Sequence, residues 1–187
     1  MMIWFTSDLH LGHTRILEHQ PARAAAFGGI HSMDGALIDS INSVVKPDDE
    51  LWHLGDFCWK ASQAAKYRQQ IKCRTIFSVV GNHDSSSLSR CFSGSWDIRV
   101  KTFRVEDSEY RFHLCHYPML SWSAMHHGSF HLYGHSHGTY EDKLDLILPG
   151  RRSMDVGIDA IYNKLGLWRP VSLEEVINLL TGKPWEL

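Results

Sequence analysis

Short runs of β-branched and aromatic residues alternate with longer segments of helical periodicity in the first half of the chain. Three of these runs have the length and composition of buried strands, at residues 3–7, 50–54 and 75–80. Between them, apolar residues recur at helical spacing from Met33 to Val45, and residues 60–72 are rich in Ala, Gln and Lys without a helix breaker. Strands that alternate with helices predict βαβ units and a parallel sheet.

The second half of the chain has a different pattern. Four further strand-like runs follow, at residues 98–105, 110–115, 130–133 and 153–158. Polar turns rather than helices are expected between them. The chain then closes with a capping box at Ser172 and Glu175, and apolar residues at helical spacing from Leu173 to Leu180 predict a final amphipathic helix. We therefore predict an α/β fold with an α+β-like second half and a mixed sheet.

Polar side chains stand just past the ends of most of these strands. Asp8 and His10 follow the first strand, and His135 and His137 follow a later one. Each pair is two residues apart, a spacing that directs both side chains of an extended chain to one side. Three other strand ends each carry one such residue, namely Asp56, Asn82 and His116. Ligands gather where the strands of open α/β sheets end, so we expect the functional site there.

These side chains are all competent metal ligands, and none of them is a thiolate. Carboxylate, imidazole and amide groups together suit Mn, Fe(II) or Zn better than a Cys-rich structural site would. Gly55, Gly81 and Gly134 precede ligands in the sequence. Because glycine lets the backbone turn sharply and approach closely, these three positions agree with a compact metal centre.

Composition narrows the class of protein further. The chain has 187 residues, of which 43% are apolar and 21% charged. These values suit one folded domain over residues 1–187 and disfavour disorder or a coiled coil. The chain carries 13 histidines against 4 cysteines. A metal centre would explain part of that histidine excess.

The charge distribution bears on binding partners. The formal net charge of -2 provides no global field to hold a nucleic acid or an anionic membrane. Residues 57–104 nevertheless carry nine basic and two acidic side chains. This basic stretch could form a phosphate-facing surface or only a solvated helix face, and both interpretations stay open.

Cysteine spacing and the N-terminus indicate a cellular location. The four cysteines form no CxxC pair, and the chain opens on a strand-like run rather than on the charged leader and apolar stretch of a signal peptide. No apolar run approaches the roughly 18–20 residues that a membrane span needs. We therefore expect a cytoplasmic protein with reduced thiols and no membrane partner. The sequence does not indicate an oligomeric state.

Five sequence blocks together resemble the signature of the calcineurin-like metallophosphoesterases, in that family's order. They are Asp8-x-His10, Gly55-Asp56, Gly81-Asn82-His83-Asp84, His116 and Gly134-His135-x-His137. Each block alone is common by chance, whereas all five in order are specific. The residues around them further resemble the compact stand-alone bacterial and phage members. The resemblance implies a four-layer αββα sandwich with mixed β-sheets and an active site at the C-terminal ends of the strands.

The same resemblance implies a role for each ligand and a cofactor of two divalent metal ions. Asp8, His10 and His137 would bind one ion, Asn82, His116 and His135 would bind the other, and Asp56 would bridge the two. Mn is the favoured metal, with Fe, Ni or Zn as alternatives. A water or hydroxide shared by the ions would attack phosphorus in line.

Two further residues of the third block would act in catalysis. His83 would stabilise the developing charge or protonate the leaving oxygen, and Asp84 would hold the His83 imidazole in its working orientation. Four residues are candidate substrate-binding groups, namely His13, Arg15, His126 and His127. Arg15 departs from the Asn that related small members often carry. For each of the four, a surface or packing role is the competing interpretation.

Two other functional classes, a serine hydrolase and a non-catalytic scaffold, agree less well with the sequence than a phosphoesterase does. The run Gly134-His135-Ser136-His137-Gly138 matches the G-x-S-x-G elbow of serine hydrolases, but no histidine follows His137 to act as the base, and residues 139–142 do not look like the start of a helix. A scaffold that keeps the fold without catalysis should have lost ligands, whereas every expected ligand is present here.

The substrate class stays open at this level. We expect a small phosphodiester, a cyclic nucleotide or a phosphomonoester, and the alternative is a metal-dependent nuclease that acts on short or single-stranded nucleic acid. The chain is short, so only residues 20–32 and 119–129 are available to cover the site. An open site is therefore expected.

Overall fold

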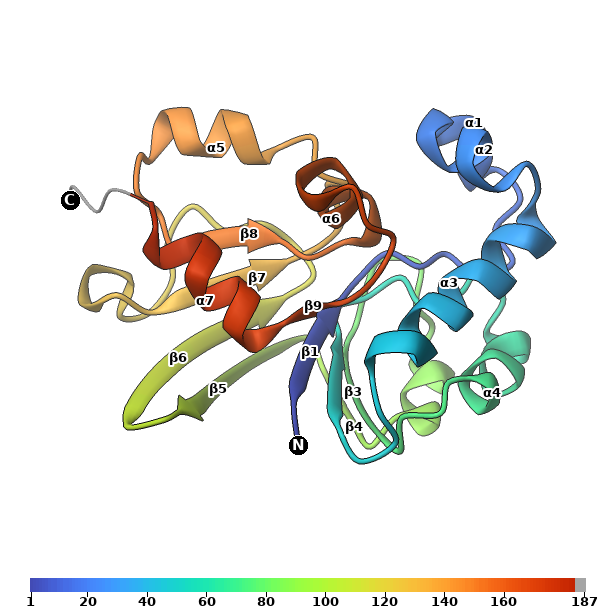
Figure 1. The fold of residues 1–187 in the computed structure, drawn as a ribbon, viewed down its shortest axis with the longest axis horizontal. Helices are drawn as coiled ribbons and strands as arrows, with labels where there is room; N and C mark the ends of the chain where they lie inside the picture. The colour runs from blue at the N-terminus through green and yellow to red at the C-terminus, as the bar shows by residue number, and fades with distance from the viewer. Residues whose placement is uncertain (184–187) are drawn as a thin grey trace.

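The computed structural model describes residues 1–183 of the chain (Figure 1). Its first sheet has the strand order β4-β3-β2-β1-β9. Those strands are β1 (Ile3–Thr6), β2 (Glu50–His53), β3 (Thr75–Val79), β4 (Gly94–Trp96) and β9 (Val171–Ser172). The first four run parallel, and β9 is antiparallel to β1. The predicted βαβ units are therefore confirmed.

Helices cover the outer face of this first sheet. They are α1 (Ile16–His19), α2 (Pro21–Phe27), α3 (Ile30–Val44), α4 (Ala61–Gln70) and a 3-10 helix (Ser86–Cys91). Met33, Leu37 and Ile41 lie on one face of α3 and are buried in a core that they share with Leu51 and Ile76 of the sheet. Burying such a stripe against a sheet is what stabilises an amphipathic helix.

The second sheet has the order β5-β6-β7-β8 and mixed direction. Its strands are β5 (Ile98–Val105), β6 (Ser108–Cys115), β7 (Phe130–Tyr133) and β8 (Ser153–Asp155). The β5 and β6 strands pair antiparallel as a hairpin, and β6, β7 and β8 pair parallel. A 3-10 helix (Met125–His127) precedes β7.

The two sheets face each other across an aromatic core. Phe5 of β1 lies 5.9 Å from Phe112 of β6 and 5.7 Å from Phe103 of β5, measured between ring centroids. Three more helices complete the fold, namely α5 (Glu141–Ile147), α6 (Ile158–Leu165) and α7 (Leu173–Thr181). Helices, sheet, sheet and helices thus form the expected four-layer sandwich (Figure 1). Among the described residues, no helix is both long and apolar enough to cross a membrane.

Three local predictions for the second half are wrong. The strand expected at residues 153–158 ends at Asp155, because the Asp155 carboxylate accepts the Gly157 N–H at 2.7 Å and turns the chain into α6. Polar turns do not connect all the later strands, since α5 lies between β7 and β8. Residues 139–142 do lead into a helix, with Glu141 and Asp142 in its favourable acidic first turn.

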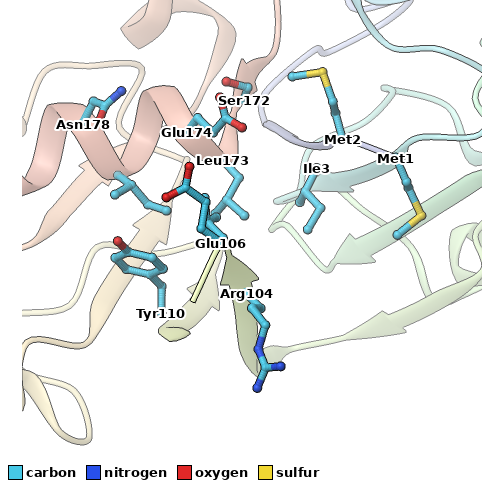
Figure 2. Close-up of a pocket in the computed structure, with 12 residues that line it drawn as sticks. Met1, Met2, Ile3, Arg104, Glu106, Tyr110, Ser172, Leu173, Glu174 and Asn178 are labelled. Carbon is cyan, nitrogen blue, oxygen red and sulfur yellow. The ribbon is translucent and has the colours of Figure 1, made fainter. Parts of the chain in front are cut away.

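The capping box of α7 is confirmed. The Ser172 hydroxyl accepts the Glu175 N–H, and the Glu175 carboxylate accepts the Ser172 N–H. A hollow of about 500 Å³ lies between the start of α7, the first residues of the chain and the β5–β6 turn (Figure 2). The residues that line it include Ile3 and Glu106, so it lies at the opposite end of β1 from Asp8. The candidate chemistry is therefore elsewhere.

Candidate metal centre

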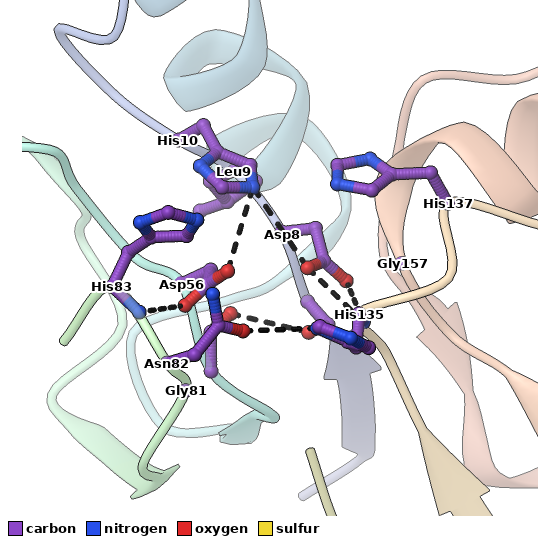
Figure 3. Close-up of polar contacts among 12 residues, drawn as sticks. Asp8, Leu9, His10, Asp56, Gly81, Asn82, His83, His135, His137 and Gly157 are labelled. Atoms are coloured by element: carbon purple, nitrogen blue, oxygen red, sulfur yellow. Dashed lines mark hydrogen bonds and ion pairs between the residues drawn. The ribbon is translucent and has the colours of Figure 1, made fainter. Parts of the chain in front are cut away.

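The loops that follow β1, β2, β3, β6 and β7 bring the expected ligands together (Figure 3). Asp8 and His10 lie beyond β1, Asp56 beyond β2 and Asn82 beyond β3. The remaining ligands come from the second sheet, with His116 after β6 and His135 and His137 after β7. A bridge between Ser7 and Gly157 joins the sheets next to this point. Both sheets therefore contribute to one site, at the predicted strand ends.

The backbone at this site is unusual. Five of the expected ligands have positive φ angles, namely Asp8 (57°), His10 (50°), Asp56 (58°), His135 (67°) and His137 (49°). Left-handed backbone is uncommon for residues other than glycine, and it persists only where the surrounding structure enforces it. Such conformations make tight turns that aim neighbouring side chains into the same space, and they cluster at functional sites.

The glycines of the motif serve mainly close approach. Only Gly55 has a positive φ, of 101°. A Cβ at Gly81 would overlap the Asp56 carboxylate, and one at Gly134 would overlap Ser7 and the Asp8 carboxylate. The expected sharp turn is therefore found at Gly55, whereas the other two glycines let loops pack directly against ligands.

Asp8, His10 and His137 form one potential ligand group, with one ligand atom from each lying within 4.8 Å of the others. The His10 and His137 rings are nearly parallel, 5.2 Å apart between centroids. Nε2 of His10 is 3.9 Å from an Asp8 carboxylate oxygen, yet it is buried and makes no hydrogen bond. A buried nitrogen left without a partner is costly unless a ligand satisfies it, so this group fits a cation.

Asp56 lies between this group and the ligands on the other side. Its Oδ2 is 3.6 Å from Nε2 of His10 and 3.5 Å from Nε2 of His116. Asp8, Asp56 and His116 form a second potential ligand group by the same 4.8 Å measure. One carboxylate oxygen thus faces imidazoles on both sides.

Asn82 contacts the imidazoles of both His116 and His135. Its Oδ1 lies 3.0 Å from Nε2 of His116 and 2.9 Å from Nδ1 of His135. These contacts bring together the three ligands that the resemblance assigns to one ion. An amide oxygen between two imidazoles is a donor set that suits a divalent transition metal.

Hydrogen bonds behind the ligands fix the histidine rings. Nδ1 of His116 lies 2.8 Å from the Leu54 carbonyl, and Nδ1 of His137 lies 2.6 Å from the Asp159 carboxylate. Each contact leaves Nε2 as the nitrogen available to a metal. Asp159 in turn accepts two hydrogen bonds from the fully buried Arg23, which also donates to the Asp8 carbonyl.

Burial and the neighbouring charges shift the ligand pKa values in opposite directions. Burial raises the pKa of Asp8 to about 7 and lowers that of His10 to about 2. Burial alone would lower the pKa of His116, but its hydrogen bond with Asp56 and the charges of Asp8 and Asp56 outweigh burial and raise it to about 9. Near neutral pH, His116 and part of the Asp8 population therefore carry a proton, which a cation must displace when it binds.

His83 and Asp84 occupy different environments. The exposed His83 ring lies 5.5 Å from the His10 ring, and its backbone N–H donates to Asp56 at 2.9 Å. The Asp84 carboxylate accepts the backbone N–H groups of Asp56, Phe57 and Gly81. Asp84 therefore fixes the loops that carry Asp56 and Asn82, in place of the expected contact with the His83 imidazole.

The other predicted binding residues divide into two groups. His13 is buried near the site, with its ring 5.4 Å from that of His10. Arg15 is exposed and pairs with Glu18 at 3.6 Å. His126 and His127 are exposed and precede β7, whereas the ligand His135 follows it, so they lie at the far end of that strand. Of these four residues, His13 is the one whose ring the structure places beside a ligand ring.

Sequence reasoning missed or did not favour the roles of four residues at this site. The segment 20–32, expected as a cover, is largely helical, and its Arg23 is fully buried beneath the ligands. Asp155 and Asp159, for which the sequence favours a turn or surface role over a supporting role behind the ligands, are buried. Trp59 lies beside His13 and His83. An arginine within an alanine-rich helix and a tryptophan three residues past Asp56 were the available signals.

Comparisons with known proteins identify the family and the fold. The family model described as calcineurin-like phosphoesterase matches residues 1–164. An uncharacterised protein of Methanocaldococcus jannaschii is 28% identical over 183 residues, which cover 95% of this chain and 90% of that protein. The Gene 66 protein of Mycobacterium phage L5 is 27% identical over 214 residues, which cover 95% of this chain and 93% of that protein. The crystal structure of a protein of unknown function from Aquifex aeolicus superposes with a TM-score of 0.71 at 21% identity, covering 95% of this chain and 98% of that one.

Proposed function

Because this chain belongs to the calcineurin-like phosphoesterase family, we propose that it is a dinuclear-metal-dependent hydrolase of small phosphoesters, with phosphodiesters, cyclic nucleotides or phosphomonoesters as substrates. The observation that carries the proposal is the position of Asp56. One oxygen of its carboxylate lies between His10 and His116, at 3.6 and 3.5 Å. A shared carboxylate between two imidazole groups supports two adjacent cation sites, since an anion there would offset the repulsion between the ions.

The donor set supports a particular assignment of ligands. Asp8, His10 and His137 would hold one ion, Asn82, His116 and His135 the other, and Asp56 both. When bound, two divalent ions, with Mn favoured, would lower the pKa of a water molecule and offset negative charge on the phosphoryl oxygens. The unpartnered Nε2 of His10 and the ring-fixing bonds to His116 and His137 support this assignment.

The chain's own groups would then position and protonate the substrate. His83 is exposed beside His10, and its main chain is tied to Asp56. Its imidazole can therefore approach a phosphoester at the centre and donate a proton to the leaving oxygen. Asp84 would contribute indirectly, by holding the Gly81–Asp84 turn against Asp56.

Three guanidinium groups of the basic stretch are engaged within the chain, which weighs against nucleic acid as the substrate. Arg68 donates to the carbonyls of Ile71 and Arg74, Arg74 pairs with Asp48, and Arg104 pairs with Glu109. Guanidinium groups that are engaged within the chain are less available to a phosphate backbone. We therefore retain the nuclease only as an outcome of the test below.

The test combines metal content with turnover. The protein, prepared with Mn, is expected to bind about two ions per chain and to hydrolyse a generic aryl phosphodiester. His116→Ala should lose metal and activity together, whereas His83→Ala should keep the metal and lose rate. A panel of monoesters, linear diesters, cyclic nucleotides and single-stranded oligonucleotides would then be ranked by kcat/KM. The absence of both bound metal and turnover would instead indicate a scaffold.

A further inference from the structure

Trp59 places an exposed aromatic ring beside the candidate metal centre. Its side chain is 43% exposed, although it directly follows the buried residues Phe57 and Cys58. The buried His13 ring lies parallel to it, with 3.9 Å between ring centroids and 6° between the planes. One face of the indole therefore packs against His13, which fixes the orientation of the ring. A planar ligand could stack on the exposed part of the ring with little loss of side-chain entropy.

The position of Trp59 relative to His83 defines which part of a substrate it would meet. The two rings are 5.2 Å apart between centroids, and His83 is in turn 5.5 Å from His10. His83 is the group proposed to protonate the leaving oxygen. The organic group attached to that oxygen would therefore extend from the metal centre past His83 and alongside Trp59.

A second exposed aromatic marks the opposite flank of the centre. Tyr117 is 46% exposed, and its ring lies 4.8 Å from that of His135 and 5.1 Å from that of His116. Tyr117 therefore stands beside the Asn82 group of ligands, whereas Trp59 stands beside His10 and His83. The two flanks differ in chemistry, since the Trp59 flank carries the imidazole of His83, which is the group proposed to protonate the leaving oxygen.

We infer that Trp59 stacks on a planar heteroaromatic ring in the leaving group, so that the preferred substrates are phosphoesters that release a nucleoside. This inference rests on the proposed function. In the hydrolysis, water adds to phosphorus, the bond from phosphorus to the nucleoside oxygen breaks, and the proton from His83 completes the released hydroxyl. Stacking of a base on an aromatic side chain is strong enough to favour such a substrate by about tenfold or more.

The experiment uses a substrate with two alternative leaving groups of similar basicity. The methyl ester of a nucleoside 5′-monophosphate can release the nucleoside and methyl phosphate, or methanol and the nucleotide. With the Mn-loaded protein, nucleoside release is expected to predominate. Trp59→Ala should lower the ratio of nucleoside to methanol release by about tenfold, and Trp59→Phe should retain most of it. A role of Trp59 in folding alone would change the total rate and leave the ratio unchanged.

Two controls separate the inference from the proposed function. Leu146→Ala removes another exposed apolar side chain, 83% exposed on α5, and should leave the ratio unchanged. The methyl ester of glycerol phosphate reports hydrolysis without a base. If wild type hydrolyses both esters but Trp59→Ala keeps the wild-type ratio, the inference is wrong and the proposed function stands. If wild type hydrolyses no phosphoester at all, both are wrong.

A competition measurement applies even if Trp59→Ala does not fold. Free nucleoside should inhibit hydrolysis of the glycerol ester by the wild-type protein at concentrations about tenfold lower than free ribose does, because only the nucleoside carries a ring to stack. Trp59→Phe should keep part of that difference. Equal inhibition of the wild type by nucleoside and ribose would overturn the inference.

Discussion

Arg23 and Asp159 lie 136 residues apart in the sequence and form a doubly hydrogen-bonded ion pair beneath the metal centre. Nε of Arg23 is 2.7 Å from Oδ1 of Asp159, and a terminal guanidinium nitrogen is 2.5 Å from Oδ2. Neither side chain is more than 5% exposed. The same guanidinium donates to the Leu9 and Asp8 carbonyls. One buried cation therefore supports the loop of Asp8 and, through Asp159, the ring of His137.

Removal of Arg23 should destabilise the protein strongly. Arg23→Ala leaves Asp159 buried without its cation, and breaking one side of a buried pair costs about 3–5 kcal/mol of unfolding free energy. The matched control is Arg15→Ala, since the pair between Arg15 and Glu18 is about 70% exposed and worth at most about 1 kcal/mol. Chemical denaturation of the metal-free proteins measures both. Similar losses in the two variants would contradict a supporting role for Arg23.

Asp159→Asn should weaken metal binding without removing a ligand. The substitution keeps the shape of the side chain but removes the charge that holds Nδ1 of His137 at 2.6 Å. Loss of such an outer hydrogen bond typically lowers metal affinity about 10–100-fold. Titration of the metal-free protein with Mn should show one weakened site and one near-normal site. Two sites of wild-type affinity would show that Asp159 does not orient His137.

Asp84 and His83 should respond differently to alanine substitution. Asp84→Ala leaves the N–H groups of Asp56, Phe57 and Gly81 without their acceptor, at a cost of about 1–3 kcal/mol for each group that stays buried and unsatisfied. We expect lower stability and lower metal occupancy. His83→Ala should leave both unchanged and reduce only turnover. Metal analysis and thermal denaturation of the two variants distinguish these roles, and a stable, fully loaded Asp84→Ala protein would refute the loop-fixing interpretation.

Metal binding should stabilise the protein more as pH rises from about 6.5 to about 9. The pKa of His116 is raised from 6.5 to about 9, so its protonated form stabilises the metal-free fold below pH 6.5, and that contribution is lost as pH rises through 9. The raised pKa of Asp8, about 7, acts in the same direction, because metal binding needs the ionised carboxylate. The increase in Tm on adding Mn should therefore grow over this range. A pH-independent increase would mean that no proton is displaced.

Alanine substitutions at two glycines should have opposite effects, because one glycine is needed for close packing and the other only lowers helix propensity. A side chain at Gly134 would overlap Ser7 and the Asp8 carboxylate, so Gly134→Ala should lower both stability and metal affinity. Gly35 lies within α3 with open space around its Cβ position, and Gly35→Ala should stabilise the protein by about 0.5–1 kcal/mol. Denaturation and metal titration of both variants provide the measurement. Normal metal affinity in Gly134→Ala would show that the loop can move aside.

The sequence predicts local features well and long-range support poorly. The spacing of Asp8 and His10 after a strand, or of Ser172 and Glu175 before a helix, is set within a few residues and follows from backbone geometry. The partnership of Arg23 with Asp159 depends on how α2 and α6 pack, which no local pattern encodes. Polar residues such as Asp155 are buried here because Ser136 and two backbone N–H groups satisfy them. Sequence patterns alone would place such a residue at the surface.

The candidate metal centre lies between the two sheets of the fold. Each potential ligand group draws on both sheets, because Asp8, His10 and Asp56 follow strands of the first sheet whereas His116 and His137 follow strands of the second. Neither half of the chain supplies all the members of either group alone. A tightly bound ion would therefore link the two sheets. Its retention during purification would show that both halves of the chain have folded into their native arrangement.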